Sequence, residues 1–271
     1  MILRWTIWVA CTLAFFAGKA QLFGGMEKLR TIEGAYRFIT TDNLNNLYLL
    51  GNTGQLKKLN ANGDSVAVFN EVRKYGGATF VDASNPVKIL LYYSDFGTIL
   101  VLDGMLQVRN TIDLRRSNIL SANPICLSYD GKIWLFDTME KKLKKLDEKG
   151  NVTFQTTDFR QLFNPVPTPV SMFDYDGYLY LYDSAQGIYV FDYYGAFKNR
   201  LLVTNKNNLS FMGKNIFATD SSAIYRYEAS GLRYDEFSMP DDLKQYRQYV
   251  FRANLLYALN DKGVDIFRLS P

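Results

Sequence analysis

Three observations predict an all-β fold, a six-bladed β-propeller. Short stretches of alternating aromatic and aliphatic residues are separated by turns rich in Gly and Asp, and this unit recurs along the 271 residues. The composition includes 19 Tyr and 19 Phe, residues that favour β-strands. No sustained apolar period of 3.6 residues runs through the sequence, so a helical fold is the poorest alternative.

The clearest unit spans residues 170–197 and reads as three strands joined by tight turns. Met172 and Phe173 lead into a turn at residues 174–177, and residues 178–182 form the second strand. A turn at residues 183–187 then leads into the third strand at residues 188–192. Alternating apolar residues between such turns are typical of a half-buried antiparallel meander.

The middle strand of this unit can be aligned along the chain. Its second residue falls at positions 48, 91, 134, 180, 217 and 257, so the spacings are 43, 43, 46, 37 and 40 residues. A more polar fourth strand follows the third in several units, as at residues 65–69 and 152–155. Periods of about 40–50 residues with four short strands per unit indicate a β-propeller.

The two ends of the chain predict how the ring closes. The sixth unit has strands at residues 249–251, 255–260 and 264–268 but lacks an outer strand. Residues 28–32 form an unassigned strand before the first unit, and we expect this N-terminal strand to complete the last blade. Such closure removes an open sheet edge. Rings of five or seven blades are the alternatives.

The first twenty residues differ from the rest. Arg4 precedes an apolar stretch at residues 5–18, and small residues stand at Gly18 and Ala20. This pattern predicts a signal peptide at residues 1–20, cleaved before Gln21. An uncleaved anchor is the alternative, although the apolar run is short for a bilayer. Residues 21–271 are expected to form one domain with no membrane span.

Charge and reactive residues exclude several functions. Removing residues 1–20 takes away Arg4 and Lys19 and no acidic residue, so the formal net charge falls from +4 to +2, which argues against nucleic-acid binding. Cys126 is then the only cysteine, and its apolar surroundings predict a small buried hydrophobe. The absence of histidine excludes Ser-His-Asp triads and zinc sites that need histidine. No catalytic residue, metal site or cofactor is predicted.

Two charged motifs have structural interpretations. The sequence Asp174-Tyr175-Asp176-Gly177 is the nearest match to a calcium loop, but it lacks a downstream acid and is expected to be a hairpin turn. The basic run at residues 141–149 is interpreted as a solvated blade edge, where charge discourages pairing between sheets.

One unit carries a family resemblance. Residues 128–137, SYDGKIWLFD, followed by residues 144–152, KKLDEKGNV, look much like a repeat of the NHL-like six-bladed propeller superfamily. This resemblance implies fold and not activity. The Tyr- and Asn-rich composition with a signal peptide is similar to secreted Bacteroidetes propellers. Some proteins of that kind are accessory subunits of envelope machinery, including the type IX secretion translocon.

The connections between blades are the longest irregular segments, at residues 113–120, 159–169 and 239–247. Long loops on a rigid scaffold often carry recognition, and Arg and aromatic residues are favoured at interface hot spots. The predicted protein-binding candidates are Arg115, Arg116, Phe159, Phe163, Tyr246 and Arg247. The alternative is that the apolar members plug the end of the propeller and pack on neighbouring blades.

Together these features predict a non-catalytic, exported propeller that binds protein partners within a membrane-associated envelope or secretion assembly. The periplasm is the expected compartment, with the cell surface or the exterior as alternatives. The second hypothesis is a carbohydrate- or small-ligand-binding propeller, including a lyase or hydrolase that works without histidine.

Overall fold

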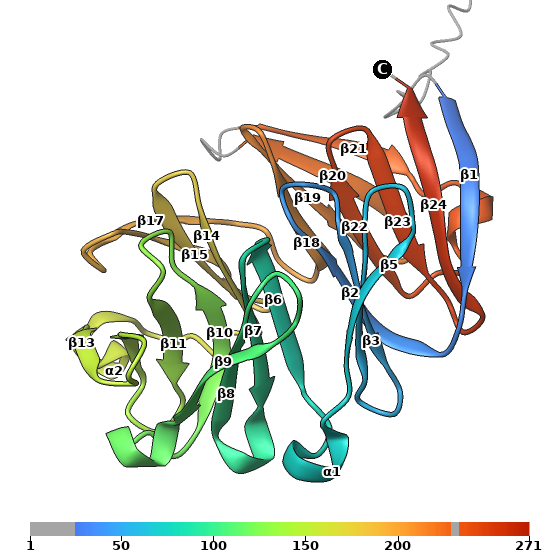
Figure 1. Ribbon diagram of the computed structural model, residues 1–271. Coiled ribbons are helices and arrows are strands. Elements are labelled where there is room, and N and C mark those ends of the chain that lie inside the picture. Colours follow the sequence, from blue (N-terminus) through green and yellow to red (C-terminus); the bar gives the residue numbers. More distant parts are fainter. Residues whose placement is uncertain (1–24, 229–232, 271) are drawn as a thin grey trace, which may run out of the picture.

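Six four-stranded antiparallel sheets form the blades of a propeller in the computed structural model, which describes residues 25–228 and 233–270 (Figure 1). The predicted fold class is therefore confirmed. Five blades use strands that are consecutive in sequence, and the sixth combines the last three strands with the first. Among the described residues, no helix has the length and apolarity needed to cross a membrane.

The first three blades follow the chain in order. Blade 1 comprises β2 (Tyr36–Thr41), β3 (Leu47–Gly51), β4 (Leu56–Leu59) and β5 (Ser65–Phe69). Blade 2 comprises β6 (Phe80–Asn85), β7 (Lys88–Tyr93), β8 (Thr98–Leu102) and β9 (Val108–Asp113). Blade 3 comprises β10 (Ala122–Leu127), β11 (Ile133–Asp137), β12 (Lys142–Leu146) and β13 (Val152–Gln155).

The last three blades complete the ring. Blade 4 comprises β14 (Ser171–Tyr175), β15 (Tyr178–Asp183), β16 (Gly187–Asp192) and β17 (Phe197–Leu201). Blade 5 comprises β18 (Asn207–Met212), β19 (Asn215–Thr219), β20 (Ala223–Glu228) and β21 (Tyr234–Ser238). Blade 6 comprises β22 (Gln248–Arg252), β23 (Leu255–Leu259), β24 (Gly263–Ser270) and β1 (Gly25–Glu33).

The outer strand of blade 6 comes from the N-terminal end of the described chain. β1 lies beside β24 in antiparallel register from Gly25 opposite Ser270 to Glu33 opposite Gly263 (Figure 1). A register shift between Lys28 and Arg30 interrupts the ladder. The strand expected at residues 28–32 lies within β1, and its pairing covers the edge of β24.

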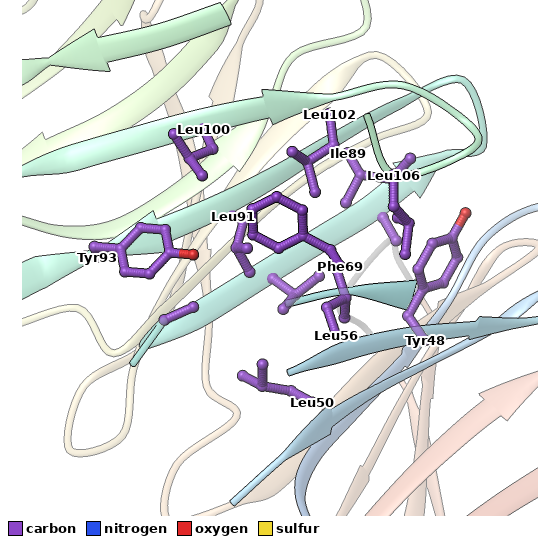
Figure 2. Packing of buried hydrophobic residues seen from close by; sticks show 13 residues of the cluster. Tyr48, Leu50, Leu56, Phe69, Ile89, Leu91, Tyr93, Leu100, Leu102 and Leu106 are labelled. Atoms are coloured by element: carbon purple, nitrogen blue, oxygen red, sulfur yellow. The ribbon is translucent and has the colours of Figure 1, made fainter. Parts of the chain in front are cut away.

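Alternation along each strand sends side chains toward two neighbouring blades. In β7, Ile89, Leu91 and Tyr93 pack in the core shared with blade 1, whereas Leu90 and Tyr92 pack in the core shared with blade 3. Figure 2 shows the core between blades 1 and 2. Each of the six junctions has such a buried cluster, including the one between blades 6 and 1. The blades therefore form a closed ring.

A repeated Asp turn joins the third and fourth strands. Asp103, Asp147 and Asp192 each accept hydrogen bonds from the backbone N–H groups two and four residues later. These turns need a residue with positive φ, which is Gly150 in blade 3. Blade 2 instead has Leu106 with φ of 59°, and its side chain is buried in the blade 1–blade 2 core. Burial offsets the backbone strain there.

The short helices α1 (Val72–Tyr75), η2 (Leu114–Ser117), α2 (Phe159–Leu162) and η3 (Asp241–Leu243) lie in the connections between blades. Because strand direction alternates, these connections share one end of the blades with the loops between second and third strands, such as η1 (Ser94–Phe96). We call this end the connection face. The opposite end carries the turns between the first and second strands and between the third and fourth strands of each blade. We call it the hairpin face.

Candidate functional site

Two of the predicted binding residues lie in the blade 3–blade 4 junction. Phe159 is fully buried, and its ring stacks on Phe191 with centroids 5.6 Å apart. Phe136 and Phe163 complete the contact, at 5.4 and 5.0 Å from Phe159. Phe163 is partly buried against the same cluster. The side chain of Asp158 accepts a hydrogen bond from the backbone of Arg160 and so begins α2, which directs Phe159 inward.

Tyr246 is also buried, whereas Arg247 remains on the surface. The Tyr246 hydroxyl donates a hydrogen bond to Asp265 in β24, and its ring contacts Phe267 edge-on. Arg247 pairs with Asp261 at 2.6 Å and donates to the backbone carbonyl of Tyr36. Both residues therefore tie the connection after blade 5 to neighbouring strands.

Asp265 joins this connection to the strand that closes the ring. Its carboxylate accepts from Lys28 at 2.8 Å and from Thr31 at 2.5 Å, both in β1, in addition to Tyr246. Burial acts to raise the pKa of Asp265, but these three hydrogen bonds outweigh burial and hold the pKa below its ordinary value. The cluster is fully paired and holds β1 against β24.

Arg115 and Arg116 lie on the connection face, and Arg115 is beside an exposed aromatic residue. Arg115 donates to the backbone carbonyl of Phe96 at 2.5 Å, and half of the Phe96 side chain is exposed. A Cβ built on Gly76 would lie 3.1 Å from the Phe96 ring, so the α1 connection also contacts it. We define the Phe96 patch as Phe96 with five exposed basic residues, which are Arg73 and Lys74 of α1, Arg115 and Arg116 of η2, and Arg37 of β2, whose guanidinium is 4.0 Å from a Cβ built on Gly77.

Other apolar side chains are also exposed on the connection face. The exposed ones lie in the connections and second-to-third-strand loops of blades 2–5, and they are Leu120, Met139, Leu162, Val170 and Leu202. Of the six predicted binding residues, the structure thus brings Arg115 and Arg116 together and places Phe159 and Tyr246 in cores. Whether the six bind a partner stays a prediction. Sequence reasoning missed Phe96, which lies in a four-residue loop with an ordinary turn composition.

The basic run at residues 141–149 is not a solvated edge, so that interpretation was wrong. Lys144 and Lys145 are in β12, which pairs with strands on both sides, and they are 3% and 6% exposed. Lys144 pairs with buried Asp137 at 2.8 Å, and Lys145 pairs with Asp130 at 3.0 Å. The long side chains reach acids at the two ends of the blade, which a pattern of alternating charges does not reveal.

The hairpin face of blades 3 and 4 holds a compact polar and aromatic cluster. The Tyr129 and Tyr193 rings lie 4.0 Å apart between centroids, and the Lys145 ammonium lies 5.3 Å from the Tyr129 centroid. Asp174 accepts through Oδ2 from the Ser128 hydroxyl at 3.0 Å and from the Tyr129 N–H at 3.3 Å. Burial raises the pKa of Asp174 above its ordinary value despite these bonds.

Cys126 is buried, as the sequence predicts. Burial raises the pKa of its thiol well above the ordinary value, and the nearby carboxylates of Asp82 and Asp174 add to the effect. The thiol is therefore protonated at neutral pH and is a poor nucleophile. No group of three or more acidic, Cys or His side chains among the described residues is arranged to hold a metal ion.

Polar side chains on the inner strands link neighbouring blades around the axis. Gln248 of blade 6 both accepts from and donates to the backbone of Ile39 in blade 1, at 2.9 Å each. Asp82 of blade 2 accepts from the backbone of Leu127 in blade 3 at 2.7 Å. Gln248 and Asp82 are therefore engaged in hydrogen bonds that hold the ring together.

Two hollows of 470 Å³ each lie at the margins of blades. The first is lined by outer strands β5 and β9 together with the α1 connection, including Val68, Tyr75 and Val108. The second lies beside β1 and η3 and includes Lys28, Tyr246 and Asp265. Neither is a deep central pocket.

Comparisons with known proteins agree on the fold alone. No protein-family model and no curated protein matches the sequence. Virginiamycin B lyase from Staphylococcus aureus is similar in structure, with a TM-score of 0.59 and 12% identity over 85% of this chain and 79% of that chain. The β-propeller domain of Cps50 (Swd1) from Myceliophteria thermophila has a TM-score of 0.61 and 10% identity, over 91% of this chain and 100% of that chain.

A further similar structure is the WD40 domain of Neurospora crassa Pan2. Its TM-score is 0.61 and its identity 9%, over 91% of this chain and 98% of that chain. At such identities the similarity shows a propeller and says nothing of activity.

Proposed function

We propose that this chain is a non-catalytic propeller that binds a protein partner through its connection face. The observation that carries the proposal is the Phe96 patch, in which an exposed aromatic ring lies beside Arg115 and the α1 connection, in segments that also expose Arg73, Lys74 and Arg116. Aromatic and Arg side chains are enriched at interface hot spots.

The charge of the Phe96 patch indicates the chemistry of the partner. Its five basic residues are accompanied by the acids Glu71, Asp95 and Asp113 in the same segments. The patch is therefore net positive, and a partner surface that is apolar at its centre and acidic at its rim would complement it.

We further propose that the partner belongs to an exported, membrane-associated envelope or secretion assembly, with the periplasm as the compartment. This part rests on the pattern of residues 1–20 and on the resemblance to secreted propellers. The lyase activity of the similar S. aureus protein is not carried over. A histidine-to-alanine variant of that enzyme is described as catalytically inactive, and this chain has no histidine.

The test is affinity purification of C-terminally tagged protein from mild-detergent envelope extracts, with mass spectrometry. The variant Phe96→Ala/Arg115→Glu/Arg116→Glu should lose a stoichiometric partner that the wild type retains. A matched control, Lys149→Glu/Lys214→Glu, makes the same change in net charge with exposed residues on the hairpin face and should retain the partner. Equal recovery by all three proteins, or no reproducible partner, would refute the proposal.

A further inference from the structure

The exposed tyrosines gather on one part of the molecule. Four tyrosines have strongly exposed side chains, namely Tyr129 at 63%, Tyr178 at 42%, Tyr194 at 83% and Tyr234 at 56%. All four lie at the hairpin end of blades 3, 4 and 5, in turns or at the first residue of a strand that leaves a turn. Three half-buried tyrosines lie at the same ends, and they are Tyr175, Tyr193 and Tyr227. We call these seven residues the tyrosine surface.

Both ends of the propeller expose apolar side chains, including Leu44, Val87 and Met105 in hairpin turns, but the strongly exposed tyrosines of the described chain lie at the hairpin end alone. On the connection face, the large exposed apolar side chains of the described residues are Phe, Leu, Met and Val. The tyrosine surface offers rings of similar size that each carry a hydroxyl. A ring with a polar tip suits a ligand that is apolar on one face and polar at its rim. Pyranose sugars have this character.

Two pairs of rings are held in place by the fold. Tyr129 and Tyr193 lie 4.0 Å apart with planes inclined by 34°. Tyr227 and Tyr234 are opposite residues of β20 and β21, with centroids 5.2 Å apart and planes inclined by 30°. Tyr178 is in blade 4, which lies between blade 3 with Tyr129 and blade 5 with Tyr227 and Tyr234. The aromatic groups therefore span three consecutive blades, which suits an extended chain of sugar rings.

Carboxylates next to the first ring pair supply hydrogen-bond acceptors. Asp174 uses Oδ2 for its bonds to Ser128 and Tyr129, and no described residue donates a side-chain or turn hydrogen bond to its Oδ1. Asp176 lies in the turn next to Gly177, and Tyr193 packs against this turn. A Cβ built on Gly177 would be 3.5 Å from the Tyr193 hydroxyl. Sugar hydroxyls are donors that such oxygens accept.

Charge at this cluster selects against acidic ligands. The lysines at this cluster are already engaged with acids, because Lys145 and Lys132 share Asp130 at 3.0 and 3.5 Å and Lys88 pairs with Glu148 at 2.5 Å. The carboxyl groups of Asp174 and Asp176 have no ion-pair partner within 4.0 Å among the described residues. These carboxylates would repel an anionic chain, whereas the hydroxyls of a neutral chain can donate hydrogen bonds to them.

From these contacts we infer that the tyrosine surface binds a neutral polysaccharide chain, whose sugar rings stack on Tyr129, Tyr193 and Tyr194 and whose hydroxyls bond to Asp174 and Asp176. The site is on the opposite end from the Phe96 patch and involves none of its residues. The chain would thus have a protein-binding end and a glycan-binding end.

The test is calorimetric titration of the full chain with cellohexaose, laminarihexaose, maltohexaose and mannohexaose, with polygalacturonate as the anionic comparison. At least one neutral hexasaccharide should bind, and polygalacturonate should not. Tyr129→Ala/Tyr194→Ala should weaken that binding by at least about tenfold. Tyr129→Phe/Tyr194→Phe, which keeps the rings, should retain most of it. Both side chains are exposed, so the variants should fold, as checked by circular dichroism.

Phe96→Ala/Arg115→Glu/Arg116→Glu serves as the control and should bind the sugar like the wild type. The same variant tests the proposed function, because it should lose the protein partner. Failure of sugar binding and failure of partner binding can therefore be told apart. The inference would be overturned if no neutral hexasaccharide binds at millimolar concentration, or if the tyrosine-to-alanine variant binds it normally. It would equally be overturned if that variant loses a protein partner and no sugar, because the tyrosine surface would then be a protein interface.

Discussion

Replacing Phe159 by alanine distinguishes the two interpretations of this residue most directly. The side chain has no exposed surface and contacts the rings of Phe136, Phe163 and Phe191. Truncating a buried Phe costs about 3–5 kcal/mol, because transfer energy and packing are both lost. For a domain of this size, that corresponds to a fall in melting temperature of about 6–20 °C.

The assay is urea unfolding followed by tryptophan fluorescence in a chain that begins at Gln21. Trp134 is then the only tryptophan, and it belongs to the same buried cluster as Phe159. Leu162→Ala is the matched control, because Leu162 is on the same short helix α2 but half of its side chain is exposed. A surface truncation of this kind should change stability by less than about 0.5 kcal/mol.

The reasoning would be refuted if Phe159→Ala unfolds at the wild-type urea concentration. If that variant also fails to recover the partner in the affinity purification, Phe159 is a binding residue, as the sequence interpretation has it. If it is destabilised by the expected amount and still binds the partner at a temperature where it is folded, Phe159 belongs to the core.

Two further predictions concern titratable groups. Burial acts to raise the pKa of Asp220, but hydrogen bonds from Lys206, Ser222 and Tyr225 hold the pKa well below its ordinary value. The ionised carboxylate therefore adds to the free energy of unfolding above pH about 4, and this stabilisation is lost as the pH falls further. Asp220→Asn should lower the free energy of unfolding by about 1–3 kcal/mol at pH 7, as measured by urea unfolding. If the difference in stability between wild type and variant stays constant down to pH 3, this assignment is contradicted. The buried Cys126 thiol should resist iodoacetamide at pH 8 until urea unfolds the chain, and rapid labelling of folded protein would show that it is accessible.

The repeat pattern was enough to predict the architecture. Each blade needs its own alternating strands and turns, so the signal is local and recurs at residues 48, 91, 134, 180, 217 and 257. The buried environment of Cys126 was also predicted, because its neighbours in the strand are apolar. The strand at residues 28–32 was identified by elimination, since the last unit lacked a partner for its edge.

Side-chain environments in the connections could not be predicted in the same way. Phe159 and Phe96 both lie in short helical segments outside the strands, yet the first is buried and half of the second is exposed, because the fold of each short helix determines which side chain faces the junction. Lys144 and Lys145 look like surface charges until Asp137 and Asp130 are brought to them by strand pairing and turn geometry.

The sequence by itself thus favoured six blades over five or seven and predicted the order of strands and the way in which the ring closes, because these depend on periodicity and on local turn chemistry. Only the tertiary structure decided which residues share a surface. The Phe96 patch joins loops from separate connections, and the tyrosine surface joins turns of three blades. Such groupings depend on how blades pack side by side, and no local pattern in the chain encodes that adjacency.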